Sequence, residues 1–203
     1  VTPAALTIGG SIDVPGEQDR FEFTLQETTR VVFDSLTNRG DLTWSLDGPA
    51  GRVDGRSFSN TDGYSYAGNP AYELSAGKYT LTVDGSGDAT GAYALRAIDA
   101  STAADLTPGV AVAGTLDGGN KTAVYRFNAN AGDKFYFDGI SASGGTVYWR
   151  LVDPFGRQER SLSSIQDDQD TFSTQCNGSY LLLVEGYTGN TAAASYSFNL
   201  RPV

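Results

Sequence analysis

Two stretches of the chain are alike: LTWSLDGPAGR at residues 42–52 and VYWRLVDPFGR at residues 147–157. In both, apolar side chains recur at every second position around a tryptophan, and a Pro-x-Gly step and an arginine follow. This alternation predicts a β-strand with one buried face, and the Pro-x-Gly step predicts a turn. We expect Trp44 and Trp149 to be core residues rather than sugar-stacking platforms, because apolar neighbours flank each of them at i±2.

The likeness between the two halves continues beyond these stretches. Residues 31–34, VVFD, correspond to residues 135–138, FYFD, and residues 77–85 correspond to residues 178–186. The order and spacing are kept over roughly 100 residues, a period that suits a complete sandwich domain better than a solenoid repeat. The sequence therefore predicts a duplicated domain.

The chain divides into residues 1–99 and residues 100–203, and the small and polar residues 99–105 are expected to form a short linker. A hydrophobic content of 39%, with 25 glycines and repeated Asn-Gly, Asp-Gly and Gly-Gly steps, is typical of short strands joined by turns. We expect an all-β fold of two tandem antiparallel β-sandwich domains, jelly-roll-like in form. The strands of the first domain are expected near residues 7–14, 19–25, 30–36, 41–47, 52–58, 71–74, 78–84 and 91–98.

The chain carries 24 acidic and 14 basic residues, a net charge of −10, and it has no histidine. This charge repels phosphate backbones and anionic lipids, so nucleic acid and membrane surfaces are disfavoured as partners. No apolar run approaches the length of a membrane-spanning helix. An acidic surface of this kind is common in extracellular bacterial proteins, where it accompanies bound Ca²⁺, although it serves solubility alone equally well.

An arginine follows the Pro-x-Gly turn in both halves, Arg52 in the first and Arg157 in the second. A position that is repeated in both halves indicates a structural role. We expect each guanidinium to pair with a nearby acid, Asp47 or Asp153, rather than to bind a ligand.

Each half also contains an alternating aromatic strand, a charged residue that opens a hydrophobic strand, a strand that ends in a Pro- and Gly-containing turn, and two tyrosine-containing strands. These elements are residues 19–23, 30–36, 42–51, 77–79 and 91–95 in the first half, and residues 125–127, 133–140, 147–156, 178–180 and 195–198 in the second. The arrangement resembles the bacterial pre-peptidase C-terminal domain, a β-sandwich appended to secreted peptidases and built into very large surface proteins. The second half departs from the family pattern at Thr122, Ala123 and Ala194.

The resemblance implies a non-catalytic extracellular module of a large secreted or surface-attached bacterial protein, located at the cell surface. It implies neighbouring domains of the same polypeptide as partners, and a role as a spacer, in positioning or in adhesion. The paired arrangement is also similar to sandwich segments of giant calcium-dependent bacterial adhesins, which adds a cell-surface or matrix glycan or protein as a further partner. The alternative function is a calcium-dependent carbohydrate-binding module.

The residue types disfavour catalysis. Without histidine, the Ser-His-Asp and Cys-His constellations and imidazole-containing zinc sites cannot form. The single cysteine, Cys176, lies in a turn-like stretch and has no second cysteine for an intrachain disulfide. A hydrolase with a pair of carboxylates is the remaining enzymatic alternative, but two sandwiches of this size leave little room for a deep cleft. We therefore expect that the chain is not an enzyme.

Calcium is the candidate cofactor, and two acidic loops are its candidate sites. Asp167, Asp168 and Asp170 place three carboxylates in one loop, where their repulsion is relieved by a cation or by water. Asp84 and Asp88 flank a second loop, which is bent by glycines and offers backbone carbonyls. The alternative for both loops is a solvated hairpin turn without a metal ion.

A loop at residues 57–70 is the candidate ligand-binding site. It is rich in turn residues, and its aromatic residues have no counterpart in the second half. Its candidate ligand-binding residues are Tyr64, Tyr66, Asn60, Asp62 and Asn69. The tyrosines would stack on a sugar while the amides and the carboxylate bind its hydroxyls; the alternative is that the tyrosines pack the loop onto its own domain.

Overall fold

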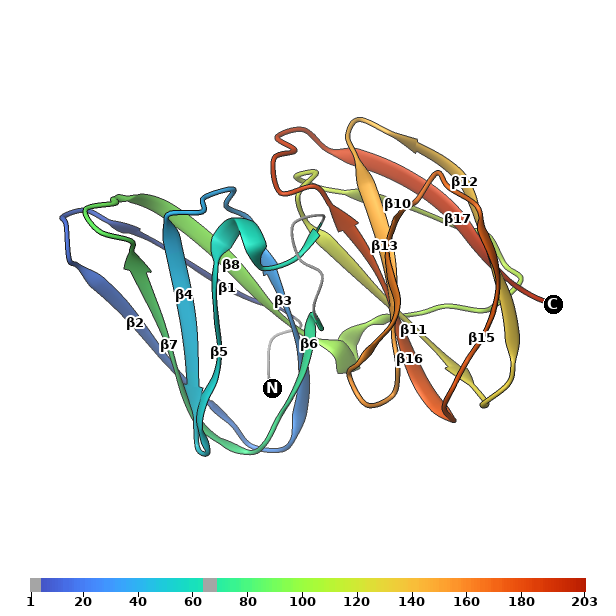
Figure 1. Cartoon of the computed structure of the whole chain (residues 1–203), viewed down its shortest axis with the longest axis horizontal. Helices are drawn as coiled ribbons and strands as arrows, with labels where there is room; N and C mark the ends of the chain where they lie inside the picture. Colours follow the sequence, from blue (N-terminus) through green and yellow to red (C-terminus); the bar gives the residue numbers. More distant parts are fainter. Residues whose placement is uncertain (1–4, 64–68) are drawn as a thin grey trace.

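The computed structural model describes residues 5–63 and 69–203, which form two β-sandwiches of two antiparallel sheets each (Figure 1). The expected all-β sandwich fold is confirmed. The strands of the first domain are β1 Ala5–Ile12, β2 Gln18–Leu25, β3 Thr29–Ser35, β4 Leu42–Gly48, β5 Gly51–Ser57, β6 Ala71–Leu74, β7 Gly77–Gly85 and β8 Gly91–Asp99. All eight strands expected from the sequence are present, with ends that differ by at most two residues.

The second domain repeats this arrangement. Its strands are β9 Ala104–Asp105, β10 Val112–Leu116, β11 Thr122–Ala129, β12 Lys134–Ser143, β13 Val147–Val152, β14 Gln158–Ser164, β15 Gln169–Ser173, β16 Gly178–Gly186 and β17 Ala194–Pro202. The sheet orders β1-β8-β3-β6 and β2-β7-β4-β5 of the first domain correspond to β10-β17-β12-β15 and β11-β16-β13-β14 of the second. The short strand β9 extends the latter sheet, in parallel to β11. The same topology in both halves agrees with a duplicated domain.

Each domain has its own core between its two sheets, centred on a tryptophan. Trp44 and Trp149 are each 1% exposed, which confirms their core position. The Trp149 ring stacks on Phe137 at a centroid distance of 3.8 Å, and the Trp44 ring lies against Phe33 at 4.9 Å. Aromatic pairs of this kind contribute stability beyond the area that they bury.

The arginines that follow the two turns pair as expected. Arg52 Nε donates to Asp47 Oδ1 at 2.8 Å, and Arg157 Nε donates to Asp153 Oδ2 at 2.8 Å. Both guanidiniums are exposed, so the pairs fix the hairpin geometry more than they add to stability.

A third apolar layer lies between the two domains. It joins the outer face of the sheet β1-β8-β3-β6 to the outer face of the sheet β14-β13-β16-β11-β9, so that four sheets stack in succession (Figure 1). The layer consists of Val32, Ala71, Ile98, Ala100, Ala103, Val124, Val152, Leu181 and Leu183. Burial on both faces is visible in β16, where every residue from Tyr180 to Gly186 is buried, whereas burial alternates along β7.

The junction between the domains contains more structure than the short linker expected from the sequence. It contains a 3-10 helix, η3 Ala100–Thr102, and then β9, which pairs with β11. Ala100 and Ala103 are buried in the layer between the domains. Their small side chains pack there with apolar residues of both domains. The junction therefore holds the domains together as well as connecting them.

The proline turn of each domain packs against a glycine that opens the neighbouring strand. Gly77 and Gly178 have φ values of +145° and +137°, a region that residues with a side chain rarely adopt. A Cβ at Gly178 would also lie 2.9 Å from Pro154 Cγ, and one at Gly77 would overlap the ring of Pro49. This contact explains why Pro-x-Gly and the later glycine occur together in both halves.

Gly77→Ala and Gly178→Ala are each expected to lower the free energy of unfolding by about 2 kcal/mol or more, because backbone strain adds to steric overlap. Gly16→Ala is the control, since its φ is +81° but nothing lies within 4 Å of the new Cβ. The control should cost only about 1 kcal/mol. Urea unfolding measures the three losses, and equal losses would contradict this role of the proline contact.

Candidate functional site: the surface between the domains

The surface between the domains combines the apolar layer with charged groups that are buried completely. Arg150 on β13 and Glu185 on β16 form an ion pair of 2.7 Å between Nη2 and Oε2, and both side chains are 0% exposed. Gly63 of the first domain completes this pair: its N–H donates to Glu185 Oε2 at 3.2 Å, and its carbonyl accepts from Arg150 Nη2 at 3.1 Å. Gln158 Oε1 accepts from Arg150 Nη1 at 2.9 Å. Buried charges require such additional hydrogen bonds.

Two further carboxyls meet at the same surface. Asp34 on β3 is fully buried and accepts from Arg96 Nη1 on β8 at 2.6 Å. Asp62, which follows the 3-10 helix η1 Phe58–Asn60, is 1% exposed and accepts from Ser35 N at 3.2 Å. Thr122 of the second domain donates its hydroxyl to Asp62 Oδ2 at 3.3 Å. Asp34 and Asp62 lie close enough to each other for each carboxyl to influence the pKa of the other.

The surroundings of Asp62 favour its protonated form. Burial and the neighbouring charges of Asp34 and Glu185 raise the pKa of Asp62 well above its usual range. Burial raises the pKa of Asp34 to about 6, although Arg96 opposes the shift. When Asp62 is protonated, the carboxylates of Asp34 and Glu185 balance the guanidiniums of Arg96 and Arg150. The buried surface then carries no uncompensated charge.

The rim of this surface is held by hydrogen bonds that cross from one domain to the other. The Arg30 guanidinium donates to the carbonyl of Pro154, which lies in the β13–β14 turn. Asn69 Oδ1 accepts from the Gln158 N–H at 2.6 Å. These contacts join residues that are far apart in sequence, and they fix the relative register of the two domains.

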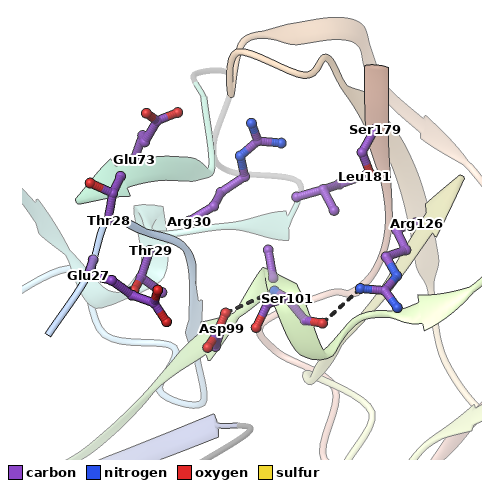
Figure 2. Close-up of a pocket in the computed structure, with 11 residues that line it drawn as sticks. Glu27, Thr28, Thr29, Arg30, Glu73, Asp99, Ser101, Arg126, Ser179 and Leu181 are labelled. Carbon is purple, nitrogen blue, oxygen red and sulfur yellow. Dashed lines mark hydrogen bonds between the residues drawn. The ribbon is translucent and has the colours of Figure 1, made fainter. Parts of the chain in front are cut away.

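A groove of about 350 Å³ opens at one edge of this surface (Figure 2). It is lined by Glu27, Thr28, Thr29, Arg30, Glu73, Asp99, Ala100, Ser101, Arg126, Ser179 and Leu181. Arg126 Nη1 donates to the Ser101 carbonyl at 2.9 Å, and Asp99 accepts from the Ser101 N–H at 2.8 Å. Figure 2 shows Leu181 between Arg30 and Arg126, with carboxylates on the side of the first domain. The groove therefore carries both signs of charge and favours neither an anion nor a cation.

The structure places the first candidate calcium loop between β14 and β15. Asp167, Asp168 and Asp170 are exposed, and Asp168 Oδ1 accepts from the Gly139 N–H at 3.1 Å. The second candidate loop lies between β7 and β8: Asp84 accepts from Gln18 Nε2 at 2.7 Å. Across residues 5–63 and 69–203, no three Asp, Glu or Cys side chains come close enough together to hold a metal ion. Calcium binding stays a prediction of the sequence.

The structure describes residues 57–63 and 69–70 of the candidate sugar-binding loop. Tyr64 and Tyr66 lie outside the described residues. Asn60 is exposed, but Asp62 is buried against the second domain and Asn69 bonds to β14. Asp62 therefore does not face a sugar, because its carboxyl is buried against the second domain, whereas Asn69 is exposed and also bonds to the second domain.

Sequence reasoning did not identify Arg150, Glu185, Asp34 and Arg96 as residues of a site. Arg150 interrupts the apolar stretch of β13, and Asp34 follows the apolar stretch of β3. A charged residue within a strand that is buried on both faces signals a partner charge nearby. That signal is present in the sequence, but it does not say which residue is the partner.

Comparison with known proteins leaves the family open. No protein-family model and no curated protein sequence matches the chain. Among solved structures, Aeromonas hydrophila PliG, a periplasmic lysozyme inhibitor of g-type lysozyme, is 13% identical, with a TM-score of 0.36 over 49% of this chain and 96% of that one. The CUB1-EGF-CUB2 domain of human MASP-1/3 is 9% identical, with a TM-score of 0.32 over 97% of this chain and 99% of that one. The CUB1-EGF-CUB2 domains of rat MASP-1 are 8% identical, with a TM-score of 0.33 over 95% and 97%.

TM-scores this low carry no argument about function, so the resemblance to the pre-peptidase C-terminal domain stays a prediction. The search for membrane-spanning helices found none among the residues whose placement is described. The function is therefore argued from the chain's own residues.

Asp62→Asn is expected to weaken the pH dependence of stability. Because the pKa values of Asp34 and Asp62 are raised by folding, the folded chain binds more protons than the unfolded chain. Their contribution to stability is therefore lost as the pH rises through the folded-state pKa values, which is about 6 for Asp34. An amide at position 62 donates to Asp34 without needing a proton. The melting temperature of Asp62→Asn near pH 8 should equal or exceed that of the original chain.

Asp34→Asn is the matched control, since it removes the charge that pairs with Arg96 and should cost about 2 kcal/mol or more near neutral pH. Thermal unfolding followed by circular dichroism measures both variants across this pH range. A loss of stability in Asp62→Asn as large as that in Asp34→Asn would contradict the protonation of Asp62 in the folded chain.

Proposed function

We propose that the chain is a non-catalytic extracellular module that acts as a rigid two-domain spacer. In this proposal it holds neighbouring domains of the same polypeptide at a fixed distance and orientation, at the surface of the cell that secretes it. An adhesion-associated role follows if such a neighbour carries the adhesive site. The observation that carries the proposal is the buried surface between the domains, with its apolar layer and its ionic groups.

The composition of this surface supports rigidity. A flexible pair of domains meets through a small polar contact, whereas a large apolar contact opposes relative motion. Here the apolar layer is continuous from β3 and β8 to β11, β13 and β16. Separation of the domains would expose Leu181 and Leu183 and would leave the Arg150–Glu185 pair without the hydrogen bonds from Gly63. Both effects favour the packed state.

The two outer faces of the four-sheet stack support the proposal that the two domains form a complete unit. The free face of β2-β7-β4-β5 carries polar side chains, among them Thr43, Ser45, Thr80 and Thr82. The free face at the opposite end is also polar, with hydroxyl pairs such as Ser141 and Ser197, whose oxygens lie 2.7 Å apart. Neither face offers the apolar surface that joins the two domains. In the proposal, the stack is therefore complete with two domains, as terminal units of stacked repeats are polar on their outer side.

The burial of Asp34 and Asp62 between the domains argues against a role of these two carboxyls in hydrolysis. General acid catalysis requires a protonated carboxyl that touches the substrate. Asp34 and Asp62 combine raised pKa values with proximity, but both are sealed between the domains. A substrate would have to separate the domains to reach them.

Leu183→Lys tests whether the domains act as one body. Leu183 is fully buried between the domains, and Thr82 is its counterpart on the free face of β7. A lysine at position 183 would place a charge in the apolar layer, at a cost of about 3 kcal/mol or more. Thr82→Lys should change stability by less than about 0.5 kcal/mol, because the side chain extends into solvent.

Differential scanning calorimetry and small-angle X-ray scattering measure the outcome on the whole chain. The original chain and Thr82→Lys should unfold in one transition with the same radius of gyration. In Leu183→Lys, the domains should unfold in separate transitions and the radius of gyration should increase. If Leu183→Lys keeps a single transition and its compact shape, the rigid-spacer proposal fails.

A further inference from the structure

The indole groups of the two equivalent tryptophans differ in one respect. In the first domain, Trp44 Nε1 donates to the Thr61 hydroxyl at 2.8 Å, and Thr61 is itself buried. In the second domain, Trp149 is equally buried, but no acceptor for its Nε1 exists within residues 5–63 and 69–203. A buried N–H without an acceptor is costly, so its retention calls for an explanation.

The connection between the edge strands explains why Trp149 lacks the acceptor that Trp44 has. In the first domain, β5 and β6 are joined by residues 58–70, which place Phe58 and Thr61 in the gap between the two sheets. In the second domain, β14 and β15 are joined by residues 165–168 alone. Ile165 fills the apolar part of this gap, but the short connection contains no counterpart of Thr61.

The residue that pairs with each tryptophan across the strands also differs. Arg56 pairs with Trp44, lies 5.9 Å from the centre of its ring, and donates to the Thr61 carbonyl at 2.8 Å. Ser163 takes the equivalent position beside Trp149. A long side chain thus closes the gap in the first domain, whereas a short one leaves the gap open in the second.

The opening between β14 and β15 is a cavity of about 190 Å³. Its lining is polar apart from the indole ring, and consists of Trp149, Glu159, Arg160, Ser161, Ser163 and Gln169. Water occupies about 30 Å³ per molecule in the liquid, so the volume exceeds the need of a single water. It is of the size of one sugar ring.

We propose that this opening, which we call the Trp149 slot, binds a monosaccharide-sized polyhydroxylated ligand, such as the terminal residue of a glycan. On binding, the side chains that cover the buried Trp149 Nε1 move aside, and one ligand oxygen accepts the indole N–H. The slot offers further donors in Arg160, whose guanidinium lies 5.0 Å from the centre of the Phe172 ring, and in Ser161 and Ser163. Sugar hydroxyls both donate and accept, and therefore suit a lining of mixed polarity.

Glu159 provides the acceptor on the other side of the slot. Its carboxylate already accepts from the Gln175 N–H at 3.2 Å and from the Tyr180 hydroxyl at 3.3 Å, so its position is fixed. Burial raises the pKa of Glu159 above its ordinary value. A carboxyl with restricted hydration gains from a ligand hydroxyl that donates to it. Because Glu159 and Arg160 carry opposite charges, the slot attracts neither an anion nor a cation strongly. The slot therefore favours neutral sugars.

The two indole N–H groups allow a test within one spectrum, because the chain has only two tryptophans. In ¹⁵N-labelled whole chain, titration with the neutral sugars glucose, galactose, mannose and N-acetylglucosamine should shift the Trp149 indole signal saturably for at least one sugar. The Trp44 signal should stay in place, because its N–H is bonded to Thr61. Trp149→Phe assigns the signals.

Ser163→Arg reproduces the closed arrangement of the first domain and should weaken sugar binding by about tenfold or more. Arg160→Gln is a second variant, expected to weaken binding without adding volume to the slot. An unchanged Trp44 signal shows in each case that the fold is retained. The proposal is overturned if none of the four sugars shifts the Trp149 signal, if both indole signals shift together, or if Arg160→Gln and Ser163→Arg bind as the original chain does.

Discussion

Burial of charged groups between the domains is the constraint on which the rest of the structure depends. Arg150 and Glu185 are held on one domain, but Gly63 of the other domain supplies hydrogen bonds to both. Asp62 likewise receives a hydrogen bond from Thr122 across the same surface. A displacement of one domain by a single residue would leave these groups buried without partners, which costs more than the loss of an apolar contact. The ionic groups therefore allow only one relative position of the two domains, and burial of the apolar layer favours their association.

The strands and the cores were predictable from the sequence, because alternation of apolar residues reports local burial directly. Trp44 and Trp149 stand out by their repeated position, and the structure confirms both as core residues. The stacking of the domains was not predicted, although a signal exists. Leu181 and Leu183 take the positions that Thr80 and Thr82 occupy in the first repeat. Such a difference between repeats marks a second buried face, but it does not say which surface covers it.

The candidate site was less predictable than the fold. Asp62 and Asn69 lie in a loop of turn residues, and composition alone does not distinguish a loop that binds a ligand from one that packs on a neighbouring domain. The Trp149 slot depends on an absent counterpart of Thr61, which becomes apparent only when the two repeats are compared in three dimensions. Comparison of the two repeats therefore separates two kinds of residue. Positions that both repeats share maintain the fold, and positions that differ are specific to one domain.

The relative orientation of the domains in solution tests the central claim most directly. Residual dipolar couplings of backbone amides, measured on the whole chain in a weakly aligning medium, give one alignment tensor for each domain. If the buried surface holds the domains as one rigid body, both tensors will agree in magnitude and direction when each domain is placed as in Figure 1. Tensors that differ in magnitude would show independent motion of the domains, and would contradict the account.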